Sequence, residues 1–187
     1  MRQTKILVDS CSYFRLAKSI HPLLGIPFGE SNYALYLNEY MEVQYKKSPR
    51  LIGKFPWITE QEYVQNRKMK LNLSAENKKE IERAYSFIKE TQESMELKLL
   101  YDDIYCLSYA YVLGISLVSD DSGVKDVAHI YDVDIMSSLE LLKLMFECKF
   151  IDEAKIIETV EFWMYNNDIP INFRNDFRNC FPKIKLK

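Results

Sequence analysis

The chain has few of the residues that interrupt regular structure. Its 187 residues include five glycines and six prolines, about half the share usual in globular proteins. So low a content argues against an all-β fold, in which many turns rely on these two residues. The apolar fraction of 48% and the charged fraction of 28% are ordinary, which excludes disordered, collagen-like and disulfide-scaffold classes.

The motifs of zinc and redox sites are also missing. Only two histidines are present, and the four cysteines form no CxxC pair: Cys11, Cys106, Cys148 and Cys180. We therefore expect no zinc site and interpret the cysteines as small core residues in a reduced cytoplasm. No apolar run approaches 18 residues, and the run in MRQTKILVDS is too short for a signal peptide. We expect a cytoplasmic protein without a membrane partner.

A strong net charge is absent as well, because 25 Lys and Arg face 27 Asp and Glu. No overall field would then attract nucleic acid, and any such attraction must come from local patches. Bases outnumber acids in residues 46–70 and in the tail 172–187. We expect the first patch to contact RNA phosphates, with Trp57 or Tyr63 stacking on bases; its leading residues are Lys46, Lys47, Arg50 and Lys54.

The alternative for both patches is a solvated helix surface. Phe173, Phe177 and Phe181 recur every four residues in the tail, a spacing that predicts a helix docked on a core. The tyrosine-rich segments are most simply core and interface residues, and Tyr is common where a chain meets a partner or a second copy of itself.

The order of the segments predicts an α/β fold. Strands are expected at 5–8, 115–118 and 133–136, while 34–37 is either a strand or the start of a helix. Helices are expected at 11–20, 75–95, 102–113, 122–131, from 137 onward, and 153–166. This alternation indicates parallel pairing. We predict a three-layer sandwich with a short, mostly parallel central sheet, in which residues 1–148 form the core unit and 149–187 a helical extension and basic tail of the same domain.

Acidic residues stand where the predicted strands end. Asp9 follows the first strand, Asp120 and Asp121 follow 115–118, and Asp103 begins the helix that leads into that strand. The carboxyl ends of parallel strands share one edge, where ligands bind, so these acids should face one cleft. Crowded carboxylates repel one another and usually indicate a hard divalent cation. Helix capping is the structural alternative for the same residues.

Three segments resemble the PIN-domain family of metal-dependent nucleases: ILVDS at 6–10, LNEYMEV at 37–43 and DDIYCLSYAYVLGISLVSDD at 102–121. The family pattern has a strand ending in Asp, a helical Glu, an Asp on a small-residue helix, and a strand leading to Ser or Thr, any residue, and Asp. The resemblance spans about residues 4–146. It implies a Mg²⁺ or Mn²⁺ site made by Asp9, Glu39, Asp103 and Asp121.

Several neighbours of these residues are alternates or supports. Glu42 lies one helical turn from Glu39 and could take its role, and a register shift of one residue would bring in Asp102 or Asp120. Ser119 matches the hydroxyl position beside the last Asp, and Ser10 could hydrogen-bond a neighbouring carboxylate or phosphate.

The resemblance implies an endoribonuclease in which two metal ions activate water and stabilise the leaving oxygen. Small members of the family are commonly toxins of type II toxin–antitoxin pairs, so RNA and a small antitoxin protein are the expected partners. Two alternatives remain: a non-catalytic PIN-like RNA- or protein-binding module, and an Asp-based phosphohydrolase with Asp9 as nucleophile. The second of these expects another Asp two residues later, where Cys11 stands.

Overall fold

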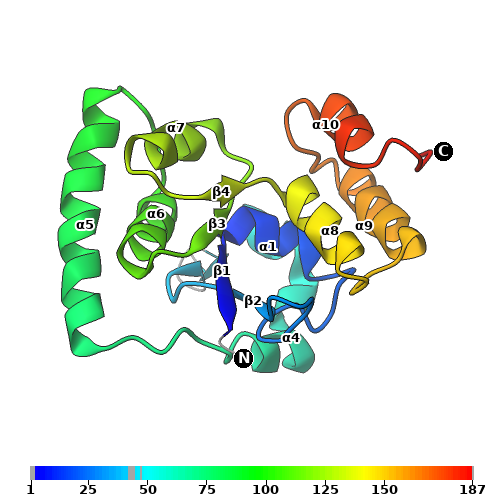
Figure 1. Cartoon of the computed structure of the whole chain (residues 1–187), viewed down its shortest axis with the longest axis horizontal. Helices are drawn as coiled ribbons and strands as arrows, with labels where there is room; N and C mark the ends of the chain where they lie inside the picture. The colour runs from blue at the N-terminus through cyan, green and yellow to red at the C-terminus, as the bar shows by residue number, and fades with distance from the viewer. Residues whose placement is uncertain (1–2, 42–44, 47, 187) are drawn as a thin grey trace.

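A computed structural model describes residues 3–41, 45–46 and 48–186. Its sheet is entirely parallel and has the strand order β2-β1-β3-β4 (Figure 1). The strands are β1 (Thr4–Val8), β2 (Tyr33–Tyr36), β3 (Ser116–Val118) and β4 (Ile135–Met136). The predicted α/β sandwich with a short parallel sheet is therefore confirmed, and the ambiguous segment 34–37 contributes a strand.

Helices cover both faces of this sheet (Figure 1). One face carries α1 (Ser10–Leu16), α8 (Ser138–Glu147), α9 (Glu153–Tyr165) and α10 (Phe173–Cys180). The other carries α6 (Tyr101–Leu113) and α7 (Ser122–Ile130), with the long α5 (Ala75–Ser94) packed outside α6. Three short elements follow β2: α3 (Pro49–Lys54), the 3-10 helix η1 (Pro56–Thr59) and α4 (Gln61–Asn66).

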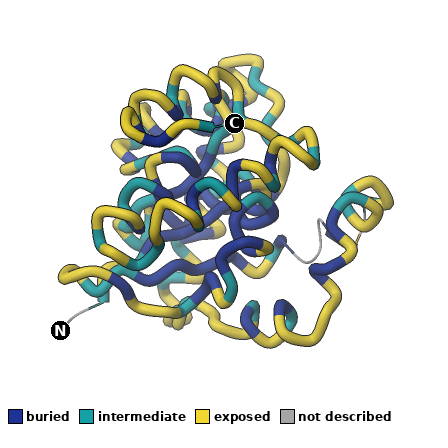
Figure 2. The backbone as a smooth tube through the Cα atoms, turned by 90° about the vertical axis from the view of Figure 1, so that its right-hand side faces the viewer, coloured by how far each residue is buried: buried dark blue, intermediate teal, exposed yellow. Residues whose placement is uncertain are grey.

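The central strand divides the interior into two cores. Ile6 and Val8 point into the core shared with α1, α8 and α9, whereas Leu7 points into the core shared with α5, α6 and α7, as alternation along a strand requires. Figure 2 shows the buried segments running through the centre of the molecule, with exposed surface on the outer turns of the helices. Both faces of the sheet are thus fully covered, as is usual for parallel sheets.

Local sequence signals account for the helix boundaries. Ser74 and Asn77 form a capping box at the start of α5, and Ser137 and Glu140 form another at the start of α8. Gly114 ends α6 in the left-handed conformation with a φ of 59°, a geometry that a residue without a Cβ adopts at little cost. These boundaries agree with the sequence prediction because each depends on residues only a few positions apart.

The C-terminal helices belong to the core beneath α1 and α8. Phe173, Phe177 and Phe181 are buried there, which confirms that their four-residue spacing docks a helix. Trp163 is fully buried, and its Nε1 donates a hydrogen bond to the Arg15 carbonyl oxygen at 2.7 Å. No helix in the described residues is long and apolar enough to cross a membrane.

Two sequence interpretations are wrong. Trp57 and Tyr63, expected to stack on RNA bases, are buried in the core beside Tyr13 and are therefore closed to a ligand. Cys11, expected in the core, is exposed near the start of α1. Periodicity does not separate an aromatic residue on a binding surface from one that closes a core, since both follow the same helical spacing.

The connections reverse direction between β1 and β3. The chain leaves β1 to form β2 on one side of it, and later returns to form β3 on the other side. In open parallel sheets, ligands bind outside the carboxyl ends of the strands at such a switch point. Asp9 directly follows β1 and Ser119 directly follows β3, so the predicted acidic residues stand at this position.

Candidate functional site

Asp9 is the buried acid at the junction of β1 and α1. Its backbone adopts an extended conformation as the N-cap, and its Oδ1 accepts a hydrogen bond from the Ser12 amide at 2.6 Å. The side chain of Ser119 also hydrogen-bonds it. The residue is only 4% exposed, and burial raises the pKa of Asp9 to about 6 although these hydrogen bonds oppose the rise.

Asp103 faces the same region from the first turn of α6. Its Oδ2 accepts a hydrogen bond from the Leu100 amide at 2.9 Å, which caps the helix. Burial, together with the charges of Asp9, Asp102 and Asp121, raises the pKa of Asp103 to about 7 although the Leu100 hydrogen bond opposes the rise. Asp103 is therefore close enough to these three aspartates, which come from both sides of it in the chain, to feel their charge.

Asp102 is as deeply buried as Asp9. Its Oδ2 accepts a short hydrogen bond from the Ser10 hydroxyl, while its buried Oδ1 has no hydrogen-bond partner among the described residues. Burial raises the pKa of Asp102, and the side chains of Ser10 and Asn38 oppose the rise. Asp102 therefore connects α6 to the start of α1, and it keeps one oxygen without a protein donor.

Asp121 is the exposed member of the group. It caps α7 by accepting a hydrogen bond from the Val124 amide at 3.0 Å, and its own amide donates to the Ser119 Oγ at 3.2 Å. Ser119 thus contacts both Asp9 and Asp121. The sequence predicted that the Ser119 hydroxyl supports a neighbouring carboxylate. In the structure this one buried side chain contacts the turns that carry Asp9 and Asp121.

Asp120, unlike Asp121, makes contacts that join elements of the fold. Its Oδ1 accepts the Ser138 amide at 3.0 Å, and its Oδ2 accepts the Ser138 hydroxyl at 2.6 Å and the Arg15 Nη1 at 2.6 Å. Both oxygens are therefore used to join β3 to α8 and α1. These contacts do not support Asp120 as a substitute for Asp121 in the site.

The structure does not bring Glu39 to the aspartates. Its Oε1 accepts a hydrogen bond from the Tyr109 hydroxyl at 3.4 Å, and it lines a cavity of about 200 Å³ with Lys70 and Lys78. Tyr109 follows Asp103 by six residues on α6, a rise of roughly 9 Å along the helix. The alternate Glu42 lies outside the described residues.

Asn38 is the residue after β2 that the sequence prediction missed. It is buried at the same edge of the sheet, and its Nδ2 donates to the Cys106 Sγ at 3.0 Å. Its side chain also opposes the rise in the pKa of Asp102. Cys106 is buried beside the acids, and burial, with the charges of Asp102, Asp9 and Asp103, raises its pKa well above the usual value. Its position in the sequence could have identified Asn38 as a candidate site residue. It is the first polar residue after β2, just as Asp9 is the first polar residue after β1.

A charged network borders the acids on the side of α1. Arg15 binds Asp120, and its Nε lies 3.4 Å from Asp168 Oδ2. Lys54 Nζ lies 3.0 Å from the other oxygen of Asp168. Cys11 is exposed as a residue, but the protein atoms around its thiol and the charges of Asp9 and Asp103 together raise the pKa of that thiol to about 12.

The predicted RNA-binding bases therefore have unequal surroundings. Lys54 is held by Asp168 and is half-buried, whereas Lys46 and Arg50 occupy exposed positions. Lys47 lies outside the described residues. Lys46 and Arg50 are therefore accessible at the surface, whereas Lys54 is engaged by Asp168.

The aspartates at the sheet edge offer few oxygen ligands for a divalent ion. Among residues 3–41, 45–46 and 48–186, no three His, Cys, Asp or Glu side chains are grouped as a metal site. Mg²⁺, however, uses one or two carboxylates and keeps several waters. The free Oδ1 of Asp102 and the raised pKa values of Asp9 and Asp103 fit such a sparse oxygen site, in which a cation would relieve the repulsion.

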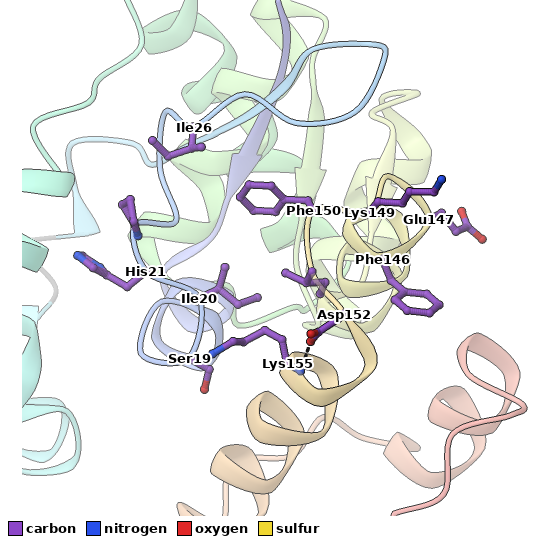
Figure 3. Close-up of a pocket in the computed structure, with 12 residues that line it drawn as sticks. Ser19, Ile20, His21, Ile26, Phe146, Glu147, Lys149, Phe150, Asp152 and Lys155 are labelled. Carbon is purple, nitrogen blue, oxygen red and sulfur yellow. Dashed lines mark hydrogen bonds between the residues drawn. The ribbon is translucent and has the colours of Figure 1, made fainter.

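A larger cavity, of about 950 Å³, lies away from the acids. Ile20, Ile26 and Phe150 line it between the segment after α1 and the turn joining α8 to α9 (Figure 3). The acids gather where α1, α6 and α7 begin, whereas this cavity lies beyond the ends of α1 and α8. It therefore contains none of the predicted site residues.

No protein-family model matches this chain, and no curated protein matches it. The PIN-domain resemblance therefore depends on the quoted motifs and on the chemistry of the residues at the sheet edge.

Proposed function

We propose that this protein is a Mg²⁺- or Mn²⁺-dependent endoribonuclease of the PIN-domain type, acting in the cytoplasm as the toxin of a type II toxin–antitoxin pair. One observation carries the proposal: Asp103 lies in the electrostatic field of Asp9 and Asp121, which come from two other parts of the chain, at the switch point of a parallel sheet. Each of the three carboxylates caps a helix, but capping does not require them to lie near one another, so a ligand of opposite charge is the simplest reason for the group.

Each acid has a separate part in the proposal. Asp9 and Asp103 would hold the cation, and because their pKa values are raised to about 6 and 7, protonation would compete with metal binding near neutral pH. When bound, the ion lowers the pKa of water and offsets charge on the scissile phosphate. Ser119 orients Asp9 and Asp121, and Ser10 orients Asp102, through the hydrogen bonds described above. Exposed Lys46 and Arg50 contribute positive charge toward the RNA backbone.

The test is cleavage of RNA by the purified chain with Mn²⁺ or Mg²⁺, and again with EDTA. Asp9→Asn and Asp103→Asn should each reduce cleavage at least 100-fold, and EDTA should abolish it. Asp134→Asn is the matched control, because this aspartate hydrogen-bonds Ser116 at the opposite edge of the same sheet. Full activity in EDTA, or in both site variants, would contradict the proposal.

The toxin role has its own test. Expression of the parent chain should arrest growth, and Asp103→Asn should relieve the arrest at equal protein level. If cleavage in vitro is confirmed but expression has no effect on growth, the nuclease stands and the toxin role fails.

A further inference from the structure

Helix α10 carries two arginines without a counter-charge. Arg174 and Arg178 are exposed, and neither forms an ion pair with any residue that the structure describes. They are one turn apart on the same face of the helix, where like charges are destabilising. Asp176, the acid on this helix, lies two positions from each arginine and therefore faces another direction. The arginine pair thus lowers the stability of the helix unless an external anion binds it.

The two arginines border a small apolar pocket of about 290 Å³. The pocket lies between the last turn of α9, helix α10 and the tail, and its other lining residues are Met164, Phe173, Phe177 and Leu186. Met164 is 48% exposed, so the apolar wall is open to solvent. The volume is at the lower end of the roughly 300–1,000 Å³ usual for ligand pockets, which suits a few side chains better than a large cofactor.

The aromatic side of this pocket is rigid. The centroids of Phe173 and Phe177 lie 5.7 Å apart, and the Phe173 centroid lies 6.4 Å from that of Trp163, which is fully buried in the core. The two phenylalanines are only 5% and 3% exposed. The pocket therefore has its shape before a ligand arrives, which reduces the entropy lost on binding.

The tail beyond α10 adds positive charge next to the pocket. Lys183 and Lys185 are exposed and form no ion pair within the described part of the chain, and Lys185 directly precedes the pocket residue Leu186. Residues 173–186 carry four basic side chains and one acidic side chain. An apolar pocket in positive surroundings is complementary to an acidic segment that carries an aliphatic side chain.

A protein segment fits this pocket better than RNA or a lipid surface does. A base would need an accessible aromatic face on which to stack, yet Phe173 and Phe177 are buried. A membrane takes up apolar side chains that project from a protein, whereas Met164 and Leu186 line a concavity. A side chain that projects from a polypeptide can enter such a concavity between two guanidinium groups.

We propose that the pocket between α9, α10 and the tail is a docking site for an acidic segment of a partner protein. An aliphatic side chain of that segment enters the pocket, and carboxylates beside it bind Arg174 and Arg178. Guanidinium groups suit this role because each can bind a carboxylate through two parallel N–H donors. The inference goes beyond the proposed nuclease, since none of the aspartates at the sheet edge lines this pocket.

The test measures binding of short fluorescein-labelled peptides to the full chain by anisotropy. In the first peptide leucine alternates with glutamate, in the second serine replaces leucine, and in the third glutamine replaces glutamate. Labelled single-stranded RNA and vesicles of phosphatidylcholine with phosphatidylserine are measured in parallel.

Two variants alter the pocket and two are matched controls. The double variant Arg174→Gln/Arg178→Gln removes both charges, and Met164→Glu places a carboxylate in the pocket. Arg83→Gln and Ile130→Glu make the same kinds of change at exposed positions of α5 and α7, which cover the other face of the sheet (Figure 1).

The first peptide should bind the parent chain. The double arginine variant and Met164→Glu should each bind it at least about 10-fold more weakly, as expected when charge-assisted contacts are lost. The serine and glutamine peptides should bind the parent chain as weakly, because each lacks one half of the recognition. Arg83→Gln and Ile130→Glu should bind the first peptide like the parent.

Urea denaturation checks the fold of each variant. The double arginine variant should be at least as stable as the parent because it removes a like-charge pair, and it decides the test if Met164→Glu does not fold. The inference is overturned if the parent does not bind the first peptide, if the leucine and serine peptides bind equally, or if the arginine variant binds like the parent. Binding of RNA or vesicles through these arginines, without binding of the peptide, would also overturn it.

Discussion

Ser119 and Asp9 are hydrogen-bonded across the junction of β1 and β3, and the same hydroxyl accepts the Asp121 amide at 3.2 Å. Ser119 is completely buried, so water does not replace this hydroxyl when a variant removes it. One side chain therefore sets the orientation of two residues that we assign to the metal site.

Ser119→Ala should reduce kcat/KM for RNA cleavage about 10- to 100-fold, the range found when a partner of a metal ligand is lost. The physical reason is that Asp9 loses a hydrogen bond that favours its charged form. Ser116→Ala is the control, because this serine begins β3, the strand that Ser119 directly follows, and bonds Asp134 at the other end of the strand. Equal activity in the two variants would show that Ser119 has no role in the site.

The metal-free protein should be more stable in mild acid than in mild base. Burial raises the pKa of Asp9 to about 6 and of Asp103 to about 7, from 3.8. The folded state thus binds more protons than the unfolded state between about pH 4 and 7, and stability falls as pH rises through that window. Two to three pKa units per group correspond to a few kcal/mol at most.

Urea denaturation in EDTA at pH 5 and pH 8 measures this effect. Asp103→Asn should raise the stability at pH 8 and flatten the dependence, since an amide has no charge to bury. Asp134→Asn should leave the pH dependence of the free energy of unfolding as it is in the parent. A parent chain that is more stable at pH 8 than at pH 5 would contradict the assignment.

The Arg15–Asp120 ion pair should contribute strongly to the free energy of unfolding. The Arg15 side chain is 13% exposed and its Nη1 lies 2.6 Å from Asp120 Oδ2. Asp120→Ala leaves Arg15 with Asp168 as a partner but removes the acceptor of the Ser138 amide and hydroxyl, so it should cost about 3 kcal/mol in the free energy of unfolding. The exposed Arg83–Glu80 pair has the same 2.6 Å distance, yet Glu80→Ala should cost no more than about 1 kcal/mol. Similar losses in the two variants, measured in urea, would reject the distinction.

Helix α9, in the C-terminal part of the chain, should be essential for the stability of the fold. Trp163 is fully buried and bonds the Arg15 carbonyl oxygen across the interface with α1. Trp163→Ala should therefore reduce the free energy of unfolding by about 3–5 kcal/mol. Tyr165, two residues later and 90% exposed, gives the control, and Tyr165→Ala should change stability by less than about 0.5 kcal/mol. A change below 1 kcal/mol in the tryptophan variant would mean that α9 is dispensable.

Prediction from sequence succeeded where the cause is local. Gly114 ends α6, and the Ser137–Glu140 capping box begins α8, because both depend on hydrogen bonds within one turn. Asp9 and Asp121 follow buried strands and cap the next helices, so their positions at the sheet edge could also be read from order alone. Segment 34–37 could not be assigned, since its strand exists only through pairing with β1.

The residues after β2 show why the rest of the site could not be predicted. Tyr40 turns toward Tyr105 on one face of the sheet, and Met41 enters the core on the other. These two packing choices direct Glu39 toward Tyr109 and leave Asn38 beside Asp102. No local preference encodes such a choice, because it depends on rings that α5 and α6 supply from far along the chain.

The sequence by itself determined strands β1, β3 and β4, the longer helices, the capped helix ends and the placing of acids after β1 and β3, because short-range hydrogen bonding and alternating burial control them. It did not determine strand β2 or the short helices α3 and α4. Only the tertiary structure decided which acids share one environment and which are used elsewhere. Asp103 meets Asp9 and Asp121, whereas Asp120 is committed to Arg15 and Ser138. The reason is that burial and repulsion depend on the distance in space between charged groups, which neighbouring positions in the chain do not fix.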